Sequence, residues 1–65
     1  MSMEYRIEEF LFPFGAWYPF RELGVFEDLE AAKAELNRWK TQYHRKFRLA
    51  CREVGEWREC RKANQ

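Results

Sequence analysis

Side chains that perform catalysis are scarce in this chain of 65 residues, which has one His, one Ser and one Thr. Its two cysteines, Cys51 and Cys60, are fewer than the four or more that usually hold a small secreted domain together. No run approaches the roughly 18 to 20 uncharged apolar residues of a transmembrane helix, and residues 1–9 lack the apolar segment of a signal peptide. We therefore expect a cytoplasmic chain with reduced thiols and no membrane partner.

These shortages also argue against an enzyme and against a metal site. Zinc needs four ligands, whereas Cys51, Cys60 and His44 offer three, at spacings that match no zinc motif. A nucleophile and base formed by Cys51 and His44 would lack an orienting acid. The sequence therefore predicts no catalytic, metal or cofactor site. The cysteines are typical of small buried apolar side chains, although neighbouring segments would bring them within reach of a disulfide.

Two segments in the N-terminal third predict the strands of a hairpin. Residues 4–12 alternate in polarity, and residues 17–22 return after the turn residues Pro13 and Gly15. Pro19 donates no hydrogen bond to a strand ladder, which is typical of an edge strand or a short one. The hairpin is therefore expected at one edge of any sheet.

The alternation in the first of these strands changes parity along its length. Tyr5 and Ile7 fall on one face, whereas Phe10 and Phe12 fall on the other. A bulge near Glu8 would bring both sets to the same side. Without that bulge, one face of the strand stays aromatic and needs another cover.

A helix is predicted over residues 29–44, because apolar side chains recur there at spacings of three and four. Asp28 is the expected N-cap, and Arg45 with Lys46 places positive charge beyond the C-terminal end, as the helix dipole favours. The apolar stripe consists of Leu29, Ala32, Leu36, Trp39 and Tyr43.

Residues 46–54 predict another strand, since apolar side chains alternate there with mostly basic ones. Gly55 interrupts the pattern. Residues 57–60 either continue the strand past a bulge or turn back as a short fourth strand. The apolar face is formed by Phe47, Leu49 and Cys51, and the opposite face by Arg48, Ala50 and Arg52.

The order of these elements, ββαβ with one more strand if residues 57–60 turn back, predicts an α+β fold. We expect a single domain over residues 1–65, with a small antiparallel sheet of three or four strands and one helix packed on one face. The helical stripe would then contact Ile7, Phe47 and Leu49.

Six of the twelve aromatic residues lie within residues 10–20. One helix on a small sheet covers a single face, so part of this run is expected to remain exposed. Because Tyr and Trp often anchor interfaces, we take Phe14, Trp17 and Tyr18 as candidate partner-binding residues. The alternatives are that the run belongs to the core, or that it joins two copies, so that the chain is a monomer or a weak homodimer.

The formal net charge of +1 conceals two halves of opposite sign. Residues 1–32 contain two basic and seven acidic residues, a balance of −5, and residues 33–65 contain ten basic and four acidic ones, a balance of +6. Each half would steer an association, or the two would complement each other within the fold.

Basic residues of the second half provide a second candidate surface, formed by Arg45, Arg48, Arg52 and Arg58. With Trp57 nearby, such a surface suits phosphates and stacked bases, or carboxylates on a protein. The alternative is that these arginines pair with the acidic residues of their own half, Glu53, Glu56 and Glu59.

The segment 26–33 reads FEDLEAAK and lies between the aromatic hairpin and the Arg-rich strand. This arrangement resembles small accessory proteins of bacteriophages, many of which combine a strand rich in Trp and Phe with a helix start similar to Phe-Asp-Ser-Leu-Glu-Glu-Ala-Lys. Glu27 and Asp28 stand here for the usual Asp and Ser, and Ala31 for the second Glu. The resemblance implies a non-catalytic inhibitor in the cytoplasm of a bacterial host, and anti-CRISPR proteins are the best-known inhibitors of this size.

Two hypotheses follow. In the first, the chain is a protein-binding inhibitor that blocks a bacterial host or defence complex, such as a CRISPR effector, through its aromatic run. In the second, it is a small nucleic-acid-binding protein that uses the Arg-rich half. The absence of an RNA- or DNA-recognition motif and the near-neutral charge favour the first hypothesis.

Overall fold

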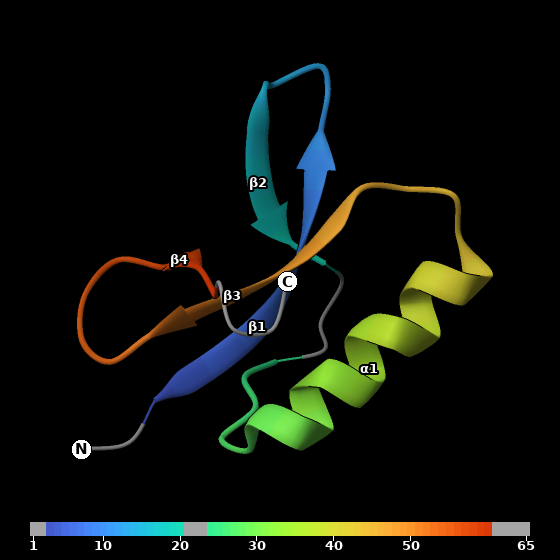
Figure 1. Cartoon of the computed structure of the whole chain (residues 1–65). Coiled ribbons are helices and arrows are strands. Elements are labelled where there is room, and N and C mark those ends of the chain that lie inside the picture. The colour runs from blue at the N-terminus through green and yellow to red at the C-terminus, as the bar shows by residue number, and fades with distance from the viewer. Residues whose placement is uncertain (1–2, 21–23, 61–65) are drawn as a thin grey trace.

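The computed structural model describes residues 3–20 and 24–60, which form a four-stranded antiparallel sheet with one helix on one side (Figure 1). The strand order in the sheet is β2-β1-β3-β4. This arrangement confirms the α+β prediction, with the fourth strand turned back. The elements are β1 (Glu4–Leu11), β2 (Ala16–Pro19), α1 (Leu29–Gln42), β3 (Phe47–Arg52) and β4 (Arg58–Glu59).

Strand β1 pairs with a different neighbour along each half of its length. Its first six residues pair with β3, from Glu4 opposite Arg52 to Glu9 opposite Phe47. Its last four pair with β2, from Glu8 to Leu11. The two registers overlap only at Glu8 and Glu9, so β2, β1 and β3 lie side by side only at this point.

The turn between β1 and β2 forms because Gly15 adopts a left-handed conformation, with φ of 61°, which side chains rarely tolerate. The N–H groups of Phe14 and Gly15 both donate to the carbonyl oxygen of Leu11, at 3.0 and 2.9 Å. Phe12 therefore lies in the turn, and β1 ends one residue before the predicted boundary. The second strand ends at Pro19, whereas residues 21–22 of the prediction lie outside the described residues.

Helix α1 begins as predicted, because the side chain of Asp28 accepts a hydrogen bond from the Ala31 N–H at 3.1 Å. It ends two residues before the predicted boundary, since Tyr43 adopts an extended conformation and its N–H donates to the Trp39 carbonyl. The Tyr43 ring still stacks on Trp39, with centroids 5.7 Å apart. The described part of the chain contains no helix long and apolar enough to cross a membrane.

The chain leaves β3 after Arg52, two residues before the predicted end, and turns back into β4. Gly55, with φ of 90°, lies within this turn. Cys51 pairs with Arg58, and the N–H of Cys60 donates to the Leu49 carbonyl oxygen at 2.8 Å. The alternative in which residues 57–60 prolong the third strand is therefore wrong.

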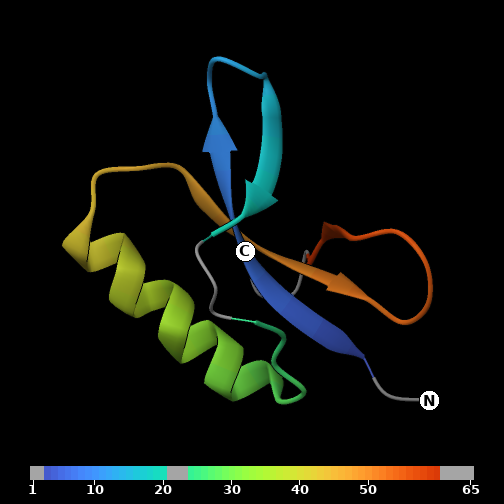
Figure 2. The same ribbon diagram turned by 180° about the vertical axis from the view of Figure 1, so that it is seen from behind.

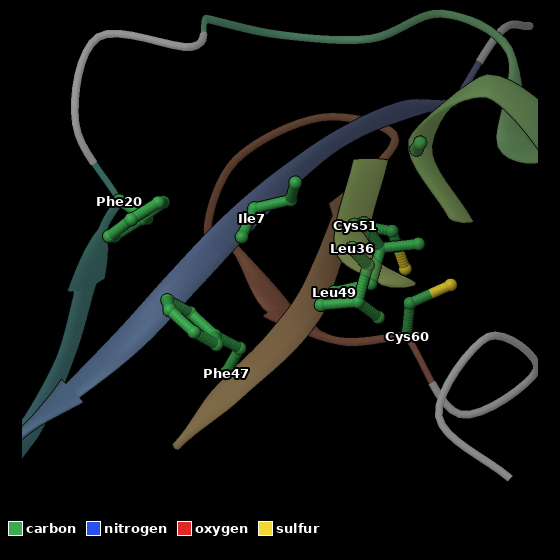
Figure 3. Close-up of a cluster of buried hydrophobic side chains, with 8 residues drawn as sticks. Ile7, Phe20, Leu36, Phe47, Leu49, Cys51 and Cys60 are labelled. Carbon is green, nitrogen blue, oxygen red and sulfur yellow. The ribbon is translucent and has the colours of Figure 1, made fainter. Parts of the chain in front are cut away.

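The core lies between α1 and one side of the sheet, as Figure 3 shows. Helical residues Ala32 and Leu36 are buried against Ile7, Leu49 and their neighbours, and Trp39 and Tyr43 pack at its margin. Phe20, just after β2, contacts the ring of Phe47 at a centroid distance of 4.7 Å. The full cluster is Ile7, Phe20, Ala32, Leu36, Phe47, Leu49, Cys51 and Cys60.

The described residues of β1 contain no bulge, because both of its registers are continuous. Ile7 therefore faces the helix, while Phe10 lies on the opposite side, which we call the outer side of the sheet. The sequence left two alternatives for the parity change, a bulge near Glu8 or an aromatic face that needs another cover. The structure shows the second. On this side, no helix of the described chain covers the sheet, and its own Arg, Glu and Trp side chains form the layer.

Candidate protein-binding surface

The hairpin formed by β1 and β2 projects beyond the helix and the rest of the sheet (Figures 1 and 2). Helix α1 packs on β1 and β3, whereas the far end of the hairpin is a ribbon of two strands. Such a ribbon has no second layer to cover its side chains. Large apolar residues at its tip are therefore left in contact with solvent.

Three aromatic residues of the hairpin are exposed, and we call them the tip aromatics: Phe12 and Phe14 in the turn, and Tyr18, which lies opposite Glu9. Their exposed fractions are 76%, 69% and 42%, respectively. Phe14 and Tyr18 form an edge-to-face pair with ring centroids 5.7 Å apart. The contact favours one arrangement of the two rings, and such preorganisation lowers the entropy that binding costs.

Trp17, the third predicted contact residue, lies apart from Phe14 and Tyr18. It is opposite Phe10 in the register, and the two rings are 5.4 Å apart. The guanidinium of Arg48 lies 4.5 Å from the Trp17 ring centroid. Trp17 is therefore partly buried in the outer layer, and Phe12, which the sequence analysis did not select, takes its place at the tip. The signal for Phe12 was its position beside the turn proline.

Glu8 lies at the centre of the outer layer and is the buried charged residue of the described chain, 1% exposed. Arg48 Nε donates to Glu8 Oε1 at 2.7 Å. Arg6 Nε and Nη2 both donate to Glu8 Oε2, at 2.9 and 2.7 Å. Two arginines thus neutralise one buried carboxylate, and no buried polar side-chain atom in the described residues lacks a hydrogen-bond partner.

Trp57 covers the other end of the outer layer. The guanidinium carbons of Arg6 and Arg52 lie 4.4 and 4.5 Å from its ring centroid. Arg52 Nε also donates to Glu4 Oε1 at 2.8 Å. This stacking helps to bury Ala50, which is fully inaccessible although no helix covers it. The prediction that Trp57 lies near Arg52 is therefore confirmed, and both side chains are engaged in contacts within the fold.

The four arginines expected to form one basic surface are separated by the fold. Arg48 and Arg52 belong to the outer layer, whereas Arg58 pairs in register with Cys51 on the side of the sheet that faces the helix. Arg45 precedes β3 and its Nη1 donates to Glu9 Oε2 at 3.1 Å. These residues form no continuous basic patch.

Three of these arginines, Arg45, Arg48 and Arg52, take their acid partners from β1 and not from the nearby glutamates of the second half. The pairs are Glu4 with Arg52, Glu8 with Arg48, and Glu9 with Arg45. For these three arginines the expectation of pairing with Glu53, Glu56 and Glu59 is wrong, because antiparallel pairing places β1 beside β3. The opposite charges of the two sequence halves thus complement each other inside the fold.

A shallow cavity of about 360 Å³ lies beside the hairpin. Its aromatic wall includes Phe10, and the Nζ of Lys46 lies 5.4 Å from the centroid of that ring. The cavity combines apolar and basic side chains next to the tip aromatics. Its lining residues are Glu9, Phe10, Leu11, Phe12, Pro13, His44, Arg45 and Lys46.

The two thiols lie together on the helix side, in another cavity, of about 570 Å³. Burial raises the pKa of the Cys51 thiol, and the hydrogen bond and charge of Cys60 raise it further, whereas Arg58 lowers it. Burial likewise raises the pKa of Tyr5, with smaller contributions from the two thiols. Both cysteines are reduced and buried. No group of three or more His, Cys, Asp or Glu residues in the described chain is arranged to hold a metal ion.

No protein family model matches the chain, and no curated protein or solved structure does so either.

Proposed function

We propose that this chain is a non-catalytic protein-binding module that contacts its partner through the tip aromatics. The observation that carries the proposal is the exposure of Phe12, Phe14 and Tyr18 on a hairpin that projects from the fold. Contiguous exposed apolar patches, in contrast to single exposed side chains, mark interaction sites on small monomers. Tyr and other aromatics also contribute much of the energy at protein interfaces.

The partner that we propose is a bacterial protein or ribonucleoprotein complex, which the chain inhibits in the manner of phage-encoded accessory proteins such as anti-CRISPR proteins. The resemblance of residues 26–33 supports this choice of target. The projecting hairpin supports the mode of binding, because a narrow ribbon can enter a groove that a compact domain cannot reach. A CRISPR effector is the first complex to test.

The test is capture of partners from bacterial lysate with the tagged chain, followed by measurement of affinity for each purified candidate. Phe14→Ala combined with Tyr18→Ala should weaken binding at least about thirtyfold, the loss expected if only one of the two side chains is an interface anchor that costs about 2 kcal/mol when truncated. Val54→Ala is the matched control, because Val54 is 80% exposed on the loop between β3 and β4, away from the hairpin.

Two outcomes are decisive. Selective loss with the hairpin variant supports the proposal. Equal binding by wild type, the hairpin variant and Val54→Ala would overturn it. A sedimentation experiment separates a heterologous partner from a second copy, because self-association through the tip aromatics would make the wild type dimeric and the hairpin variant monomeric.

The nucleic-acid hypothesis loses support from the ion pairs of the outer layer. Arg48 and Arg52 each donate to a carboxylate and lie over an indole ring. A phosphate would have to displace those carboxylates.

A further inference from the structure

Cys51 and Cys60 come from different strands and face the same cavity. Cys51 lies in β3, and Cys60 directly follows β4. Both side chains line the same cavity, and Figure 3 shows them close together at one end of the core. The backbone hydrogen bond from the Cys60 N–H to the Leu49 carbonyl oxygen, at 2.8 Å, holds the end of β4 beside β3.

We propose that Cys51 and Cys60 form an oxidative modification site, at which a small disulfide such as glutathione disulfide converts the two thiols into an intramolecular disulfide. One cysteine thiolate attacks a sulfur of glutathione disulfide, breaks its S–S bond and releases one glutathione thiolate. The second cysteine thiolate attacks the protein sulfur of the mixed disulfide and releases the second glutathione. Two electrons pass to the oxidant, and the two cysteine protons go to the two released thiolates.

The cavity beside the thiols gives an oxidant access without unfolding of the chain. Its volume of about 570 Å³ is in the range of pockets that accept small molecules. Arg58 lines this cavity, and its positive charge favours the Cys51 thiolate against the effect of burial. The remaining walls are Met3, Tyr5, Leu29 and Glu59.

The disulfide would join β4 to β3 across a loop of about ten residues. Closing a loop of this length lowers the entropy of the unfolded chain, so the ratio of folded to unfolded protein should rise on the order of a hundredfold. The site is therefore expected to stiffen the edge of the sheet in oxidising surroundings, and to release it again when a thiol reductant attacks the disulfide.

The experiment incubates the reduced full chain in native buffer with glutathione disulfide and follows its intact mass. We expect the wild type to lose two hydrogen atoms and to accumulate little glutathione adduct. Trypsin cuts after Arg48, Arg52 and Arg58, so the product should contain the peptide LACR linked to a peptide beginning ECR. Cys51→Ser and Cys60→Ser should each stop at the adduct of a single glutathione.

Two results would overturn the proposal. One is a wild type that accumulates glutathione adducts as the single variants do. The other is an internal disulfide that forms only after urea is added. Because the linked peptides are sought in the wild type, the test does not depend on the folding of either serine variant. Hydrogen exchange of the Cys60 amide supplies a second readout, and slower exchange is expected after oxidation.

Discussion

Glu8 and Arg48 are direct partners in the register of β1 and β3, and Arg48 Nε lies 2.7 Å from Glu8 Oε1. The carboxylate is buried and is also bound by Arg6. This pair joins an acidic residue of the first half of the sequence to a basic residue of the second half. It thus connects the charge asymmetry of the chain to its topology.

Removal of the Glu8 carboxylate should destabilise the fold markedly. In Glu8→Ala, Arg6 and Arg48 would be left next to each other without a counter-charge in a largely buried layer. Truncating one partner of a buried pair costs about 3 to 5 kcal/mol. Since the two arginine side chains are 23% and 20% exposed, we expect a loss of about 2 to 3 kcal/mol in the free energy of unfolding by urea.

The matched control is Glu4→Ala, whose side chain and that of its partner Arg52 are 40% and 35% exposed. An ion pair with this exposure is worth about 1 kcal/mol or less. If the two variants lost equal stability, the burial of Glu8 would have no energetic consequence.

Leu36 tests the core beneath the helix. It is 2% exposed and packs within the cluster that α1 forms with the sheet. Leu36→Ala should cost about 2 to 5 kcal/mol, because it removes buried methyl groups and leaves a cavity. Val54→Ala, at a site 80% exposed, should stay within about 0.5 kcal/mol of wild type. Thermal or urea unfolding followed by circular dichroism measures both.

The helix start can be tested at Asp28. Its side chain accepts the Ala31 N–H, so Asp28→Ala should lower stability by about 1 kcal/mol. Asp28→Asn keeps the acceptor and should cost only a few tenths of that amount. Equal losses for the two variants would mean that the carboxylate acts through its charge and not as a cap.

Stability should fall at alkaline pH through Cys51. Its pKa is raised above the ordinary value of 9.0, chiefly by burial, so the folded chain holds this proton more tightly than the unfolded chain. The stabilisation is complete below the ordinary value and is lost as the pH rises through the raised one. Under reducing conditions, the unfolding free energy of the wild type should therefore fall more steeply than that of Cys51→Ala as the pH rises from the ordinary pKa to the raised one. Parallel curves would contradict the shift.

Binding to DNA provides a further test of the outer layer. Since Arg48 and Arg52 are engaged by carboxylates, neither single-stranded nor duplex DNA should bind measurably at about 50 mM salt. Fluorescence anisotropy is the measurement. Tight binding that weakens steeply with added salt would restore the nucleic-acid hypothesis.

Local pattern was sufficient for the helix and for the faces of β3. The spacing from Leu29 to Tyr43 predicted which side of α1 is buried, and Asp28 marked its start, because both depend on residues within a few positions of each other. The end of the helix was less predictable. Tyr43 keeps its place in the apolar stripe while its backbone is already extended.

The ion pairs and the faces of the hairpin were not predicted, because they depend on pairing between residues that are distant in the sequence. Glu8 and Arg48 are 40 residues apart in the sequence, and only the register of β1 with β3 brings them together. The faces of the hairpin depend on register in the same way. Once Phe10 lies opposite Trp17, the indole turns toward Arg48, and Phe12 is left in the turn.

The division of β1 between two partners has an evolutionary consequence. The half that pairs with β3 carries Tyr5 and Ile7, which pack in the core with the helix, whereas the half beyond Glu9 contributes none of the described core residues. Substitutions in the ribbon therefore cost the core little. Selection can alter the turn and its aromatics to follow a changing target, while the helix and the remaining strands keep their sequence.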